Sequence, residues 1–221
     1  MKKLILVFGL LFSLNAFAQS IDPDDSFTFD IGLPNAFVNK PFKNIMQGLC
    51  SATATYQYAT KSGLAFGVGG TYTYFAINEF RLPTRIYGGM HNVGVFIKIG
   101  YEKFWTERIG TDIGLKVGTV QSWTVSDTLK RSGIWANQNR ALYIEPCVSF
   151  VITADVNSSF RLTFGYPLMG FNFTPQLVGE SSTMGFDINE LAKNCSFLTV
   201  GFGYTFYFNG KKSSNSGWDE D

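Results

Sequence analysis

Large apolar side chains alternate with small or polar ones along the stretch from Leu198 to Phe208. One set consists of Leu198, Val200, Phe202, Tyr204, Phe206 and Phe208, and the other of Thr199, Gly201, Gly203, Thr205 and Tyr207. Neighbouring side chains of a β-strand point to opposite faces, so a period of two separates an apolar face from a polar one. The stretch is about eleven residues long, which is what a tilted strand needs to cross a bilayer. The pattern predicts a membrane-spanning strand whose apolar face meets lipid.

The same period of two recurs along the chain. It predicts seven further strands, over 26–33, 49–58, 64–75, 91–102, 109–123, 140–154 and 160–169. An even number of strands allows an antiparallel sheet to close with both ends of the chain on one side. The fold class expected is therefore all-β, as an eight-stranded antiparallel transmembrane β-barrel.

The connections between these strands alternate strictly in length. Short links are expected at 59–63, 103–108 and 155–159, and long links at 34–48, 76–90, 124–139 and 170–196. Outer-membrane barrels have short periplasmic turns and longer extracellular loops. A soluble β-sandwich has no physical reason to sort its loops in this way, so the alternation supports the membrane barrel independently of the strands.

The two ends of the chain differ from this central region. Met1-Lys2-Lys3 precedes an apolar stretch and the small residues of Ala16-Phe17-Ala18, which is typical of a secretory signal peptide. We expect a cleaved signal peptide over 1–18, a barrel domain over 19–208 and a disordered periplasmic tail over 209–221. No run of about 18 apolar residues follows the signal peptide, so no transmembrane helix is expected.

Composition agrees with this assignment. Aromatic residues make up 16% of the chain, including 22 Phe and 10 Tyr, and Gly occurs 23 times. Charged residues are also 16%, below the roughly 25% of a typical soluble domain. The formal net charge of +1 gives no reason to expect a nucleic-acid partner.

At this point the chain resembles the eight-stranded outer-membrane β-barrel family that includes the OmpA transmembrane domain, OmpX and PorT-like proteins. The likeness covers 26–208 and lies in architecture together with the aromatic final strand Tyr204-Thr205-Phe206-Tyr207-Phe208. The resemblance implies a location in the cell outer membrane of a Gram-negative envelope. The chain differs by continuing to Asp221, which would make a terminal-strand assembly signal internal.

Charged residues occur within the strands on the polar face. With the apolar face outward, seven of them point into the lumen: Asp30, Lys98, Glu102, Asp112, Lys116, Glu145 and Arg161. Four acids and three bases can pair across the narrow interior of an eight-stranded barrel, which side chains nearly fill. We expect a packed polar plug, with a functional channel or a proton path as the alternative.

Aromatic residues are expected in two bands, one at each membrane interface. The candidates are Tyr58, Tyr101, Trp105, Phe160 and Phe208 at the short-turn side, and Tyr72, Tyr74 and Trp123 at the long-loop side. Girdles of this kind flank the apolar band of outer-membrane barrels. The alternative is the general preference of strands for aromatic residues.

Catalytic chemistry has little support in the sequence. His91 is the only histidine and has no Ser two residues on, so a headgroup contact is favoured over catalysis. No metal-ligand, nucleophile-elbow or phosphate-loop motif occurs, and we expect no catalytic residue, no cofactor and no metal. Cys50 and Cys195 are expected near strand ends on the same side, where they either pair or remain free thiols, as Cys147 would.

The longest link carries apolar residues that suggest a contact surface. These are Phe171, Phe173, Leu177, Met184 and Phe186. They predict either contact with a protein partner or folding of the loop over the barrel mouth.

Three functions remain open from the sequence. The leading hypothesis is a non-enzymatic outer-membrane protein that contacts outer-membrane lipid or lipopolysaccharide and binds a protein partner through its extracellular loops. The second is a membrane component of a protein export or assembly machine, which the PorT-like resemblance implies. The third is a lipid-modifying enzyme that uses His91.

Overall fold

The computed structural model describes residues 21–22, 25–82, 85–180, 183–208 and 212–213. The expected signal peptide over 1–18 lies outside these residues. Of the expected tail over 209–221, only Lys212–Ser213 is described, and these two residues form the short strand β11, paired with β1 (Ile21–Asp22). Cleavage of the signal peptide and disorder of the remaining tail therefore stay predictions.

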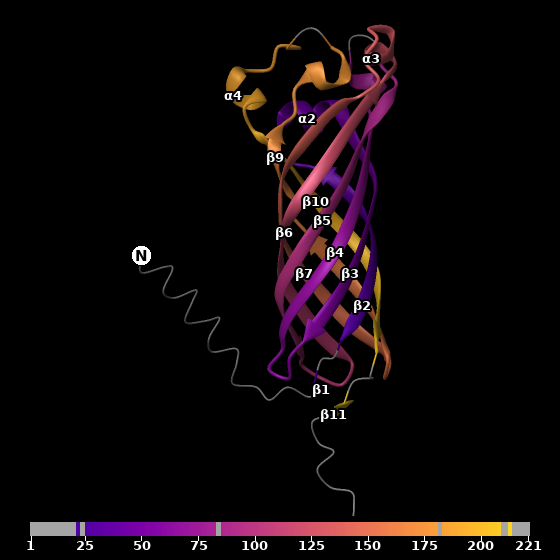
Figure 1. Ribbon diagram of the computed structural model, residues 1–221, viewed down its shortest axis with the longest axis vertical. Helices are drawn as coiled ribbons and strands as arrows, with labels where there is room; N and C mark the ends of the chain where they lie inside the picture. Colours follow the sequence, from indigo (N-terminus) through magenta and orange to yellow (C-terminus); the bar gives the residue numbers. More distant parts are fainter. Residues whose placement is uncertain (1–20, 23–24, 83–84, 181–182, 209–211, 214–221) are drawn as a thin grey trace, which may run out of the picture.

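The described chain forms a closed antiparallel β-barrel, as the sequence predicts (Figure 1). Its strands are β2 (Ser26–Ala36), β3 (Met46–Ala59), β4 (Leu64–Ile77), β5 (Gly88–Phe104), β6 (Ile109–Ser126), β7 (Asn137–Asp155), β8 (Ser158–Gly165), β9 (Leu168–Asn172) and β10 (Asn194–Tyr207). Each strand pairs with the next along the chain, apart from a split in the seventh. Pairing of β10 with β2, from Phe197 opposite Ala36 to Tyr207 opposite Ser26, closes the barrel.

The seventh expected strand is divided into β8 and β9. Proline has no amide N–H to donate to the sheet, and Pro167 lies in the gap between the two segments. Both segments pair with β7 on one side and β10 on the other, so together they fill one position in the wall. The barrel is thus eight-stranded.

The two faces of the wall differ as the alternating pattern requires. On β10, Phe202 is 60% exposed on the outside, whereas the neighbouring Gly201 and Gly203 face the interior and are buried. The same alternation holds on β5, where Val95 is 64% exposed and Lys98 is buried. A belt of exposed apolar side chains therefore surrounds a polar interior.

The two ends of the barrel differ in their connections. At the short-turn end, tight links join β3 to β4, β5 to β6 and β7 to β8, and the β1–β11 pair lies near them (Figure 1). At the opposite, long-loop end are the short helices α2 (Lys40–Ile45), η2 (Glu79–Arg81), α3 (Asp127–Arg131), η3 (Pro175–Val178) and α4 (Ile188–Leu191). None of the helices in the described ranges is both long and apolar enough to cross a bilayer.

Three neighbouring strands are longer than a bilayer crossing needs. β5, β6 and β7 contain 17, 18 and 19 residues, compared with the roughly 9–11 of a membrane-spanning strand. Figure 1 shows α3 at the long-loop end, above the ribbons that lead into it. This part of the wall stands above the apolar belt.

Candidate functional site

The interior of the barrel contains a buried ionic cluster centred on Arg161 of β8. The Arg161 guanidinium lies 2.6 Å from Glu102 of β5 and also pairs with Asp112 of β6. Lys98 of β5 pairs with the same Asp112 carboxylate at 2.5 Å. All four side chains are at most 7% exposed. Buried charges need partners because each loses its hydration, and here every charge has at least one counter-charge.

Neutral side chains complete the hydrogen bonding of this cluster. Gln57 of β3 donates to Glu102 at 2.8 Å and accepts from the Lys98 ammonium at 2.7 Å. The Tyr207 hydroxyl of β10 donates to Glu102 at 2.9 Å. Sequence reasoning missed Gln57 and Tyr207 as members, although both occupy inward positions of their strands.

A second ion pair lies deeper towards the long-loop end. The Lys116 ammonium of β6 is 3.1 Å from the Glu145 carboxylate of β7, and the Tyr143 hydroxyl donates a short hydrogen bond to Glu145. The Phe96 ring lies 5.3 Å from the Lys116 nitrogen, in cation–π geometry. Six of the seven expected lumenal charges thus form ion pairs.

The seventh, Asp30 of β2, has a different environment. It is half-buried, and its carboxylate accepts a hydrogen bond from the Thr163 hydroxyl at 3.1 Å. No cation among the described residues lies within ion-pair distance of it. Asp30 therefore faces the lumen but is held by a hydroxyl.

Inward glycines make room for the charged side chains. A Cβ atom at Gly165 would overlap the Glu145 carboxylate, and one at Gly203 would overlap the Asp30 carboxylate. At Gly114, a Cβ would lie 2.7 Å from Lys98 Cε. The glycines and the long charged residues are therefore parts of one packing arrangement.

Little space remains in the interior. Among the described residues, two small cavities of about 20 Å³ each are lined in part by Asp30. One is bounded by Lys116, Tyr143 and Glu145, and the other by Lys98 and Arg161. A water molecule needs roughly 10–15 Å³ by this measure, so each cavity has room for one or two waters.

Both ends of the lumen are packed with apolar side chains. At the short-turn end, Phe104, Val151 and Tyr207 are fully buried against one another. At the long-loop end, a larger cluster that we call the cap joins Phe42 of α2 and Phe173 of the last loop to the wall. The Phe42 ring centre lies 4.8 Å from that of Phe75 and 5.4 Å from that of Phe173.

Asn39 joins the two loops that form the cap. Its side-chain oxygen accepts from the Phe42 amide at 2.8 Å and so caps α2, while its amide nitrogen donates to the Lys193 carbonyl at 2.5 Å. An ion pair between Lys40 and Glu190 connects α2 to α4 nearby. Asn39 is itself fully buried, so the cap depends on its hydrogen bonds.

The five loop residues expected to contact a partner are buried or partly buried at the mouth of the barrel. Phe171 is 9% exposed and Phe173 is fully buried, which fits the second of the two alternatives from the sequence, folding of the loop over the barrel mouth. The reason is the apolar mouth of the barrel, which takes up the apolar side chains of its own longest loop. The remaining three, Leu177, Met184 and Phe186, are partly buried against the same cluster.

Other loop residues, which sequence reasoning missed, are exposed instead. Phe80 of η2 is 84% exposed, Trp135 after α3 is 78% exposed, and Ile188 of α4 is 77% exposed. These three residues lie in long loops, where the sequence has no periodic pattern that distinguishes exposed from buried apolar residues.

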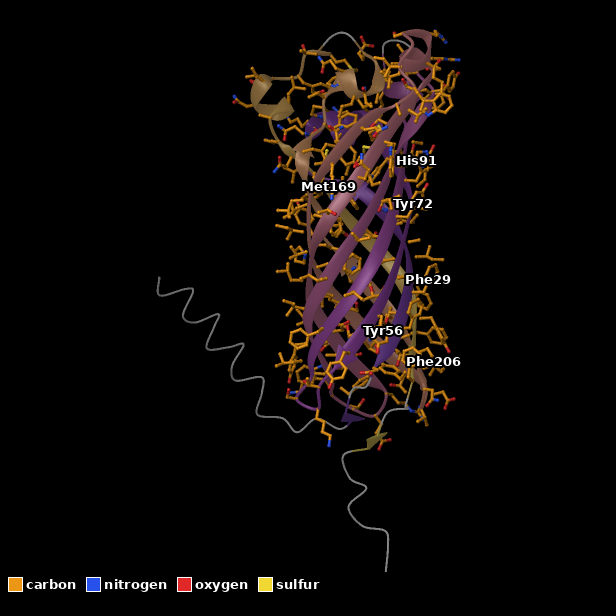
Figure 2. The ribbon with its side chains drawn as sticks, viewed as in Figure 1. Phe29, Tyr56, Tyr72, His91, Met169 and Phe206 are labelled. Carbon is orange, nitrogen blue, oxygen red and sulfur yellow. The ribbon has the colours of Figure 1, made fainter. Side chains whose placement is uncertain are left out.

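The expected interfacial aromatics all lie on the outside of the barrel or at its short-turn rim, exposed or half-exposed. They are Tyr58, Tyr72, Tyr74, Tyr101, Trp105, Trp123, Phe160 and Phe208. In Figure 2, Tyr72 lies towards the long-loop end of the wall and Tyr56 and Phe206 towards the short-turn end.

His91 is held by aromatic neighbours. The Tyr72 hydroxyl lies 2.9 Å from His91 Nδ1, and the Tyr74 ring centre lies 4.7 Å from that of the imidazole. The hydrogen-bonding group that the structure places beside the imidazole is thus the Tyr72 phenol.

The three cysteines are free thiols. Cys50 is exposed on the outside of β3, whereas Cys195 is buried in the cap. Since the two side chains lie on opposite faces of the wall, the pairing left open by the sequence does not form.

Comparison with known proteins identifies the fold. No protein-family model matches the sequence, and no curated protein matches it either. Among solved structures, the chain is similar to Neisserial surface protein A, with 11% identity, 83% of this chain and 97% of that chain covered, and a TM-score of 0.53. It is also similar to the outer membrane protein OprG of Pseudomonas aeruginosa, with 10% identity, 86% and 100% coverage, and a TM-score of 0.52. The chain therefore has the fold of eight-stranded outer-membrane barrels.

Proposed function

We propose that this protein is a non-enzymatic integral outer-membrane β-barrel whose lumen does not conduct. The observation that carries the proposal is the belt of exposed apolar side chains around the whole wall, for example Ile31 at 58%, Ile113 at 55% and Phe202 at 60% exposure. Exposed apolar surface of this extent is unfavourable in water, whereas lipid solvates it. The likeness in fold to outer-membrane proteins supports the same location.

The filled interior supports the absence of conduction. Ion pairs occupy the middle of the lumen, and apolar clusters occupy both ends. An ion crossing this lumen would have to displace buried, paired charges and two apolar layers.

The loops supply the surface for a protein partner in this proposal. Phe80, Trp135 and Ile188 are held at the long-loop end by a rigid wall, and loops on such scaffolds commonly carry binding functions. Binding of a protein partner through the loops is compatible with two roles for this protein: a surface protein that acts alone, or a component of an export or assembly machine.

Fractionation of cells that produce the full chain tests the membrane location. We expect the protein in the outer-membrane fraction, with an electrophoretic mobility that changes on heating because the closed sheet resists detergent. Recovery of the protein from the soluble periplasmic fraction would refute the proposal.

Crosslinking on intact cells tests the partner. Replacing Trp135 and Phe80 by Ser should abolish the crosslinked species of the wild-type protein and leave the barrel heat-modifiable. A control variant, Val156→Ser, removes an exposed apolar side chain at the short-turn end. Unchanged crosslinks in the Trp135 and Phe80 variants would show that these residues do not contact the partner.

A further inference from the structure

The outer wall carries one polar and aromatic patch that the proposed function leaves unexplained. Strand pairing places Tyr74, His91, Trp123 and Gln138 in one line across β4, β5, β6 and β7. The same pairing places Tyr72 and Arg140 in the next line. We call these six residues the β4–β7 patch.

Two groups in the patch can bind an anion. Arg140 is exposed on the outward face of β7, and none of the described residues forms an ion pair with it. Among the outward-facing positions of the described strands, it is the one full positive charge in the half of the wall nearer the long loops. His91 lies two strands away from Arg140 and two residues further along the strands, so their backbones are roughly 10–12 Å apart. The long Arg140 side chain and one bound phosphate can bridge this separation.

His91 is preorganised for such a contact. The hydrogen bond between Tyr72 and Nδ1 and the Tyr74 ring, packed against the imidazole with an angle of 35° between the ring planes, restrict the orientation of the imidazole. The Tyr72 hydroxyl can donate to Nδ1, and in that tautomer Nε2 carries the proton and is a donor on the far side of the ring from the phenol. Figure 2 shows His91 and Tyr72 together on the wall near the long-loop end.

The position of the patch identifies the type of ligand. The next outward residues towards the short-turn end are apolar: Val93 below His91 is 44% exposed, and Leu142 below Arg140 is 55% exposed. A ligand that fills both surfaces has an anionic head and an acyl chain. Beside Arg140 and His91 lie the Trp123 ring, which can stack on a sugar, and the Gln138 amide, which can form hydrogen bonds to one.

We propose that the β4–β7 patch binds the phosphorylated glycolipid headgroup of an outer-leaflet lipid of the lipopolysaccharide type. Arg140 and His91 hold the phosphate, and the acyl chains lie along the apolar belt beneath. The inference rests on the proposed function in one respect, since it requires this end of the wall to face the outer leaflet.

Native mass spectrometry of the full chain, delipidated in detergent, tests the site. The protein is titrated with diphosphoryl lipid A, with lipid A stripped of its phosphates, and with phosphatidylglycerol. We expect diphosphoryl lipid A to bind best. The double variant Arg140→Gln, His91→Gln should lose about ten- to a hundredfold in affinity, as expected when hydrogen bonds to a charged group are removed.

Two further variants serve as controls. Lys43→Gln removes an exposed cation of α2 and should bind like the wild type. Arg140→Lys keeps the charge and should retain most of the affinity, because a lysine binds phosphate as a point charge. Unchanged binding by the double variant, or equal binding of the phosphate-free lipid, would overturn the site. Equal binding of phosphatidylglycerol would overturn its assignment to a glycolipid. These titrations do not depend on where the protein is found in the cell, so their failure is distinguishable from a failure of fractionation.

Discussion

At the scale of single residues, Arg161 connects its own strand to three others across the interior. It reaches from β8 to Glu102 on β5, to Asp112 on β6 and, through its Nε, to Thr205 on β10. Its inward position follows from the period of two, and so do those of Lys98 and Asp112. The ion-pair partners of Arg161 do not follow from this period, because the sequence does not specify which strands face each other across the lumen.

Replacing Arg161 by Leu should destabilise the barrel by about 3–5 kcal/mol, because Glu102 loses its buried cation and Asp112 retains only Lys98. Urea unfolding in lipid vesicles measures the change. The matched control is Arg131→Leu, which removes an exposed pair with Asp127 and should cost less than about 1 kcal/mol. Equal stability of the two variants would contradict a structural role for the cluster.

Gly165→Ala should also destabilise the barrel, by about 1–3 kcal/mol, because the new methyl group displaces Glu145 from Lys116. The control is Gly170→Ala in β9, the segment that shares one strand position of the wall with β8. A Cβ atom at Gly170 would have the Leu142 amide nitrogen as its nearest neighbour, at an ordinary contact distance of 3.5 Å. The same unfolding measurement applies to both. If Gly165→Ala unfolds like Gly170→Ala, the carboxylate has room to move and the proposed packing is wrong.

At the scale of elements, the strands could be predicted, whereas the cap followed from the sequence only as one of two alternatives for the longest loop. A strand that faces lipid on one side and a polar interior on the other has a clear period of two, which identified β2 to β7 and β10, and β8 and β9 together as one strand. Above the apolar belt both faces are polar, so the pattern stops at Arg140 although β7 begins at Asn137. Loop residues such as Phe42 have no period at all, and their burial depends on which loops meet over the mouth.

The cap makes a prediction at this scale. Asn39→Ala removes the N-cap of α2 and the bond to the Lys193 carbonyl, and should cost about 1–3 kcal/mol. It should also expose the last loop to proteolysis, which gel electrophoresis after limited digestion detects. Asn44→Ala changes an exposed residue of the same helix and serves as the control. Identical digestion of both variants would show that Asn39 does not hold the loops together.

At the scale of the whole molecule, the barrel has three layers along its axis: the apolar cap, the ionic interior and the apolar cluster at the short-turn end. The interfacial aromatic residues and the β4–β7 patch lie on the outside of the wall around these layers. Between the two apolar clusters, six of the seven interior charges form ion pairs, and the cavities described around Asp30 are small. The wall and the loop tips then remain as the surfaces that can bind lipid or protein.

This layering predicts the electrical behaviour of the molecule. In planar lipid bilayers, we expect the wild-type protein to show no steady conductance. Replacing 173–186 by a short Gly/Ser linker removes Phe173 and Val178 from the cap, yet we still expect no open channel. The reason is that the Arg161 cluster and the buried Phe104, Val151 and Tyr207 remain in place. Stable steps of ionic current through the wild-type protein would contradict a closed lumen. Steps that occur only in the shortened variant would show that the cap alone closes the lumen and that the ionic interior admits ions.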